Sequence, residues 1–221
     1  MRRSESVIGC SNPRLANNWP ASRVMHALAQ NDKQGLIQFL QSRYTDRFFD
    51  PISQLIKSAE MKGSGFSIMA LCCLLIESIE ALWDGLPSSN RHELKNCQSL
   101  SPPPEYEVPK PEWPRSNEDV FTAFFCNPRF SACFGAIDGS VFYKAIRNGL
   151  LHQAQTKDGW IISATATEIW DANGKTINRN RFFEALLKSF DAFLDELRSA
   201  HWSEERWRKA NRKIWWLIRL S

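Results

Sequence analysis

The sequence has few of the residues that hold metals or build disulfide frameworks. Its six cysteines include no C-x-x-C pair, no H-E-x-x-H motif is present, and its four histidines are scattered, at His26, His92, His152 and His201. We therefore expect neither a metal site nor a cofactor. Cys72 and Cys73 lie inside an apolar run, where free thiols behave as small hydrophobic groups, and a reducing cytoplasm is the simplest setting for them.

The sequence also has no segment that reads as a secretory signal or a membrane span. No apolar core follows the first six residues, and the longest apolar stretch, residues 68–76, is followed directly by Glu77. Phosphate-binding glycine loops and the G-x-S-x-G elbow are absent, so ATP, dinucleotide and serine-hydrolase chemistry are not predicted. The net charge of +4 is mild and permits nucleic-acid binding without arguing strongly for it.

Apolar residues recur at helical spacing over most of the chain. The pattern predicts helices over residues 32–44, 51–61, 66–86, 116–126, 138–152, 180–199 and 203–220. The first half of the segment 66–86 is apolar on most sides, which is typical of a helix at the centre of a bundle. The fold class predicted is all-α.

The chain divides by composition into an extension and a bundle. We interpret residues 1–62 as an N-terminal arm and helical extension, and residues 63–221 as the helical bundle. Prolines concentrate in residues 87–117, which we expect to form a surface insertion. Residues 160–178 contain β-prone segments around Asn173-Gly174, so a small β-hairpin is predicted there.

Residues 147–152, Arg-Asn-Gly-Leu-Leu-His, place three polar side chains on an otherwise apolar helix. Arg-x4-His with Asn after the Arg, at the end of a helix in an all-helical chain, resembles the HEPN superfamily, whose members often cleave RNA through such a motif. The resemblance implies a HEPN-like helical bundle, with Arg147 and His152 as the catalytic pair and Asn148 as the polar residue beside the arginine. It covers the bundle in organisation and these six residues in motif.

The residue types suit RNA cleavage without a metal. The 2′-hydroxyl of RNA can act as the nucleophile, so the protein needs a group that moves protons and a cation that stabilises charge on phosphorus. Histidine suits the first task and arginine the second. If both residues serve chemistry more than packing, replacing either one should stop cleavage and leave the melting temperature close to that of the parent.

Two further residues are assigned supporting roles. Glu77 follows the apolar run, where a carboxylate needs a basic partner, and Arg147 is a natural one if the two helices pack together. Lys144, one turn before Arg147, would add positive charge for an RNA backbone. The other interpretation of Glu77 is a carboxylate on a solvated helix face.

Helix geometry favours a homodimer as the active species. Five positions on a regular helix turn Arg147 and His152 apart by about 140°, so one motif does not aim the pair together. The resemblance implies paired motifs in a shared cleft, and the nine Trp and fourteen Phe exceed what one core obviously needs. The expected partners are therefore an RNA substrate, a second copy of the chain and a protein inhibitor or antitoxin. The expected role is that of a toxin or antiphage defence effector.

Other interpretations of the same residues remain open. His152 can be a favourable cation at a helix C-terminus, with Arg147 merely solvated or paired. Many HEPN members carry Tyr two residues after the His, where this chain has Ala154, which would suit a non-catalytic HEPN-like module that binds RNA or protein. A regulatory protein that recruits a partner through its Pro-rich segment and C-terminal helix is another possibility. The basic residues of that helix fit a nucleic-acid surface, a membrane surface or a solvated face.

Overall fold

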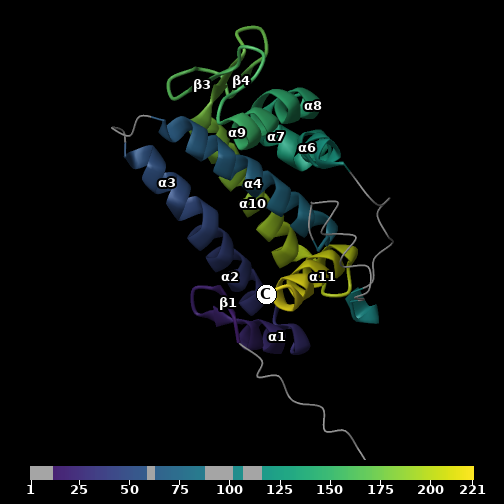
Figure 1. Cartoon of the computed structure of the whole chain (residues 1–221). Coiled ribbons are helices and arrows are strands. Elements are labelled where there is room, and N and C mark those ends of the chain that lie inside the picture. The colour runs from purple at the N-terminus through teal and green to yellow at the C-terminus, as the bar shows by residue number, and fades with distance from the viewer. Residues whose placement is uncertain (1–11, 59–62, 88–101, 107–115) are drawn as a thin grey trace, which may run out of the picture.

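The computed structural model describes residues 12–58, 63–87, 102–106 and 116–221 of the chain (Figure 1). The N-terminal part begins with two short antiparallel strands, β1 (Arg14–Ala16) and β2 (Trp19–Pro20). Helices α1 (Ala21–Ala29), α2 (Lys33–Tyr44) and α3 (Asp50–Lys57) follow, with a π-helical turn, η1 (Thr45–Phe49), between the last two. The predicted helices over 32–44 and 51–61 are present, although the second ends earlier, at Lys57.

The middle of the chain contains the long helix α4 (Ser64–Asp84) and a short 3-10 turn, η2 (Pro104–Tyr106). Two helices then follow in succession, α6 (Asn117–Cys126) and α7 (Pro128–Phe134). Ser116 and Asp119 form a capping box at the start of α6, with reciprocal hydrogen bonds of 3.2 and 2.7 Å. Helix α7 was not predicted, because Asn127-Pro128 is typical of the end of a helix, whereas proline is also favoured in the first turn of one.

The segment that carries the motif consists of three consecutive helical pieces. They are α8 (Gly139–Val141), the π-helical turn η3 (Phe142–Arg147) and α9 (Asn148–Gln153). The prediction of one helix over 138–152 was therefore right in extent, and the π-turn inside it was not foreseen.

The predicted hairpin is present as part of a three-stranded sheet. Strands β4 (Trp170–Asp171) and β5 (Thr176–Asn178) pair antiparallel across residues 173–174, and β3 (Ile161–Ser163) pairs parallel to β5 on its other side. The chain ends in the long helices α10 (Arg179–Ser199) and α11 (Glu205–Arg219), close to the predicted 180–199 and 203–220.

Helix α4 is the centre of the bundle. It packs against α3, α6, α9, α10 and α11, and Figure 1 shows α4 and α10 side by side through the middle, with the β3–β5–β4 sheet at one end and α11 at the other. It is the one helix among the described residues that is long and apolar enough to cross a membrane, and 56% of that apolar window is buried inside the protein. Its burial on several sides is that of a core helix, as its sequence predicts.

Aromatic side chains fill the core between α6, α7, η3 and α10. Phe142 stacks on Phe182 with ring centroids 5.3 Å apart, and Phe124 stacks on Phe130 at 4.6 Å. Phe66 is the exposed member of the fourteen phenylalanines, at 41%. The phenylalanines other than Phe66 are therefore used inside one chain, and their number does not argue for a second subunit.

The N-terminal helices share this core. Buried residues from Leu15 through Ile52 belong to the same hydrophobic cluster as those of α4, α10 and α11, so no separate core divides the described part of 1–62 from the bundle. Most of the Pro-rich insertion, residues 88–101 and 107–115, lies outside the described residues, as do 1–11 and 59–62. The described turn η2 packs on α11 and buries Tyr106.

Candidate active site

The π-turn η3 presents the first residue of the motif. Asp138 starts the segment by accepting hydrogen bonds from the backbone N–H groups of Ser140 and Val141, at 2.9 and 3.0 Å. At its other end the N–H of Asn148 bonds to the carbonyl of Tyr143, five residues back. Such wide turns inside helices are frequently found at functional sites. Arg147 is the last residue of this one.

Gly149 lets the chain fold back over the motif. A Cβ added to Gly149 would lie 2.3 Å from the carbonyl oxygen of Gln155, so only glycine admits this approach. Ala154 takes a left-handed conformation with φ of 54°, and the N–H of Lys157 then bonds to the carbonyl of Ala145 at 2.8 Å. The role of Gly149 is thus to allow close backbone packing at the end of α9.

Arg147 and Glu77 form an ion pair between η3 and α4. The Nε and Nη2 atoms of Arg147 each lie 3.0 Å from Oε1 of Glu77, and the two side chains are only 12% and 16% exposed. This contact is the one that the sequence suggested for Glu77. Because two nitrogens meet one carboxylate, the plane and direction of the guanidinium are fixed.

Asn148 and Tyr143 complete the surroundings of the guanidinium. Nη1 of Arg147 donates to Oδ1 of Asn148 at 3.3 Å, and Cζ lies 5.6 Å from the centroid of the Tyr143 ring. Tyr143 was not among the predicted site residues. Its position four residues before Arg147, one helical turn away, was the available signal.

Within the part of the chain that the structure describes, some hydrogen-bond donors of this arrangement have no partner. A guanidinium has five N–H donors, and the contacts to Glu77 and Asn148 engage three of them. Since the Asn148 oxygen faces the guanidinium, the amide nitrogen of Asn148 points its own two donors elsewhere. A group of donors on a fixed cation is suited to binding an oxyanion such as phosphate.

Cys73 lies one helical turn before Glu77 and is fully buried. Burial raises the pKa of its thiol well above the ordinary value, the Glu77 carboxylate acts in the same direction, and Arg147 opposes both. The thiol is therefore neutral and packed, and the site has no thiolate nucleophile at this position.

His152 and Lys144 lie apart from this cluster. His152 is exposed in the last turn of α9, and no contact joins it to Arg147 in the described structure. Lys144 pairs with Glu118 on α6 at 3.0 Å and donates to Ser140 at 2.9 Å. The structure thus brings Arg147, Asn148 and Glu77 together, and holds Lys144 toward α6.

Two grooves among the described residues lie away from the five predicted site residues. A groove of about 470 Å³ lies between α7, α10 and residues 164–169, and another of about 350 Å³ lies between α1 and α2. Neither includes Glu77, Lys144 or residues 147–152.

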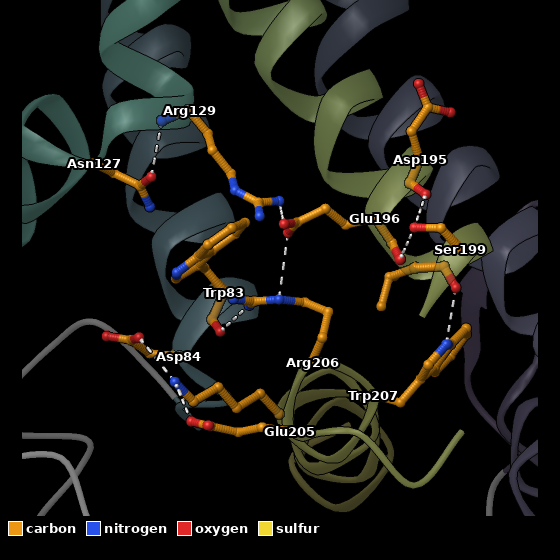
Figure 2. A network of polar contacts seen from close by, with 12 residues as sticks. Trp83, Asp84, Asn127, Arg129, Asp195, Glu196, Ser199, Glu205, Arg206 and Trp207 are labelled. Carbon is orange, nitrogen blue, oxygen red and sulfur yellow. Dashed lines mark hydrogen bonds and ion pairs between the residues drawn. The ribbon is translucent and has the colours of Figure 1, made fainter. Parts of the chain in front are cut away.

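The basic residues of α11 are largely occupied by internal contacts (Figure 2). Arg206 donates to the carbonyl of Trp83 at 2.8 Å and its Cζ lies 3.5 Å from that ring, while burial, and then the charge of Arg129, lower its pKa to about 10. Lys209 lies 2.9 Å from Glu205 and 4.0 Å from Asp84. Arg206 and Lys209 therefore hold α11 against α4.

Among the described residues, no group of three or more His, Cys, Asp or Glu side chains is arranged to hold a metal ion. No family model matches the chain, and no curated protein or solved structure matches it. The resemblance to the HEPN superfamily therefore rests on the sequence alone.

Proposed function

We propose that the chain is a metal-independent endoribonuclease of the HEPN type. The observation that carries the proposal is the Arg147 guanidinium, fixed by Glu77 and flanked by Asn148, with donors left over for an anion. In this proposal the donors bind the non-bridging oxygens of one phosphodiester and stabilise the charge that develops on phosphorus.

The proposed reaction uses the RNA itself as nucleophile. The 2′-oxygen attacks phosphorus and loses its proton, the bond to the 5′-oxygen breaks, and that oxygen gains a proton. The products are a 2′,3′-cyclic phosphate and a 5′-hydroxyl. The imidazole of His152 is the group that moves these protons. Two transfers are needed, and a dimer with two copies of His152 has one imidazole for each.

The proposed active form is a two-fold homodimer with the motifs facing each other. Exposed Leu74, at 43%, lies one turn from Glu77 on α4, and exposed Leu151, at 38%, lies one turn from Arg147 on α9. Since α4 packs on α9, these leucines flank the ion pair and supply apolar area for an interface that carries the site. A second subunit would bring a second His152 to each Arg147.

The test is incubation of the pure protein with mixed RNA in excess chelator. We expect cleavage to persist, to leave 2′,3′-cyclic phosphate and 5′-hydroxyl ends, and to spare DNA, which lacks the nucleophile. Arg147→Ala and His152→Ala should each abolish it, and Glu77→Gln should weaken it less. Activity that disappears with chelator and returns with magnesium would overturn the mechanism.

A second candidate is a non-catalytic module that binds RNA or protein. The observation in its favour is the separation of His152 from Arg147 within one chain. RNA that is bound and left intact by the parent and by His152→Ala alike would establish this alternative. Ala154, at the position where many HEPN members carry Tyr, fits it as well.

The biological role proposed is that of a cytoplasmic toxin or antiphage effector held in check by a protein inhibitor. It rests on the HEPN resemblance, and the buried central helix agrees with a soluble protein. Expression of the parent in a bacterial host should arrest growth and fragment cellular RNA, whereas His152→Ala should do neither. Normal growth with intact RNA at equal protein level would contradict the role.

A further inference from the structure

Tyr143 is held rigidly beside the candidate catalytic arginine. One side of its half-buried ring meets the Arg147 guanidinium, with 5.6 Å from Cζ to the ring centroid. The ring also packs against buried Phe121, with centroids 5.6 Å apart and planes tilted by 43°. Its backbone carbonyl accepts the π-turn hydrogen bond from Asn148. Ring and backbone are therefore both fixed relative to Arg147.

The hydroxyl group of Tyr143, by contrast, has no structural task. It makes no hydrogen bond within the described residues, and it does not belong to the buried polar atoms that lack a partner, so it is open to solvent. Tyr44 shows the opposite arrangement, because its hydroxyl lies 2.9 Å from Oγ and 3.1 Å from the carbonyl oxygen of Ser78 in the core. The phenol of Tyr44 stabilises the fold, and that of Tyr143 does not.

We infer that the Tyr143 hydroxyl is a further RNA contact, which donates to the phosphate held by Arg147 or to the neighbouring phosphate. The inference rests on the proposed function. A phenol oxygen stands beyond the edge of its ring, so a ring in contact with the guanidinium places that oxygen within one nucleotide of a phosphate bound there. The hydroxyl adds a neutral donor to those of Arg147 and Asn148, and the fixed ring lets it act without a loss of side-chain freedom.

The substitution Tyr143→Phe removes the oxygen and keeps the ring that Arg147 and Phe121 contact. We would place it in the His152→Ala background, so that RNA stays intact, and measure affinity for a fluorescent single-stranded RNA by anisotropy. The expected result is binding about tenfold weaker than that of His152→Ala alone, because one hydrogen bond to a charged group is lost. The melting temperature should not change.

Tyr44→Phe in the same background is the matched control, and it should lower the melting temperature with RNA affinity unchanged. The salt dependence of binding gives an independent readout. Tyr143→Phe should leave its slope unaltered because no charge is removed, whereas Arg147→Ala should make it shallower.

The outcomes separate this inference from the proposed catalysis. Equal affinity with and without the Tyr143 hydroxyl would overturn the inference and leave the ribonuclease proposal standing. If Tyr143→Phe weakens RNA binding and the parent protein does not cleave RNA, the Tyr143 contact is supported and the ribonuclease proposal is overturned. A chain that binds no RNA would overturn both.

Discussion

Removal of the Arg147 side chain should destabilise the protein as well as stop cleavage. Arg147 and Glu77 lie 3.0 Å apart with 12% and 16% of their side chains exposed, so Arg147→Ala leaves a largely desolvated carboxylate without this cation. Loss of one partner costs about 3–5 kcal/mol when the pair is fully buried, whereas an exposed pair contributes less than about 1 kcal/mol. A value of about 2 kcal/mol follows for this intermediate case. The sequence alone had suggested an unchanged melting temperature.

The assay is a double-mutant cycle that comprises the parent, Arg147→Ala, Glu77→Gln and the double variant. In a domain of this size about 2 kcal/mol corresponds to a fall of roughly 4–8 °C in melting temperature. The double variant should be less destabilised than the sum of the single variants by about 1 kcal/mol, because the pair is lost only once. Urea titration checks the free energies independently.

The refuting results are specific. One such result is that Arg147→Ala has the melting temperature of the parent. Another is that the destabilisation of the double variant equals the sum of those of the two single variants. In either case the pair does not stabilise the fold, and Glu77 cannot orient the guanidinium in the way proposed. A lost ribonuclease activity in Arg147→Ala could then be assigned to chemistry alone.

His152 is exposed, so His152→Ala should keep the melting temperature of the parent while cleavage is lost. A changed melting temperature would assign His152 a packing role. Gly149→Ala should lower stability by about 2 kcal/mol and weaken cleavage, because its Cβ would collide with the Gln155 carbonyl; an unchanged denaturation curve would contradict this reason. Burial raises the pKa of Tyr44 to about 12, so its contribution to stability is complete below pH 10 and is lost as the pH rises through 12. The stability difference between the parent and Tyr44→Phe should therefore shrink over that range, and a constant difference would refute it. Light scattering should show a dimer, and a fully active monomer of about 25 kDa would exclude the shared site.

The parts of the fold that could be predicted are those whose signals are local. The spacing of apolar residues located α2, α4, α10 and α11 to within a few residues, and Asn173-Gly174 located the β4–β5 turn. The pairing of β3 with β5 could not be found in this way, because partners fifteen residues apart carry no local signature. Helix α7 had no separate start signal, because Asn127 both follows the end of α6 and caps the start of α7, and Pro128 is compatible with either position.

The same distinction applies to the candidate site. A carboxylate directly after an apolar run requires a partner, so Glu77 could be matched with Arg147 before the helices were placed. Lys144 could not be matched with Glu118, because both residues look like ordinary solvated charges in the sequence and only the packing of α6 beside η3 brings them together. The π-turn was not predictable either, since its residues have the composition of an ordinary helix.

The central position of α4 has a consequence for the synthesis of the protein. Its partner α11 begins about 120 residues after α4 ends, and α10 also comes late in the chain. At about 5–20 residues per second a ribosome needs roughly ten seconds to add that length, during which α4 lacks α11, one of the helices that bury it. A segment with the length and apolarity of a membrane span thus stays partly uncovered during synthesis until the last helix closes the bundle.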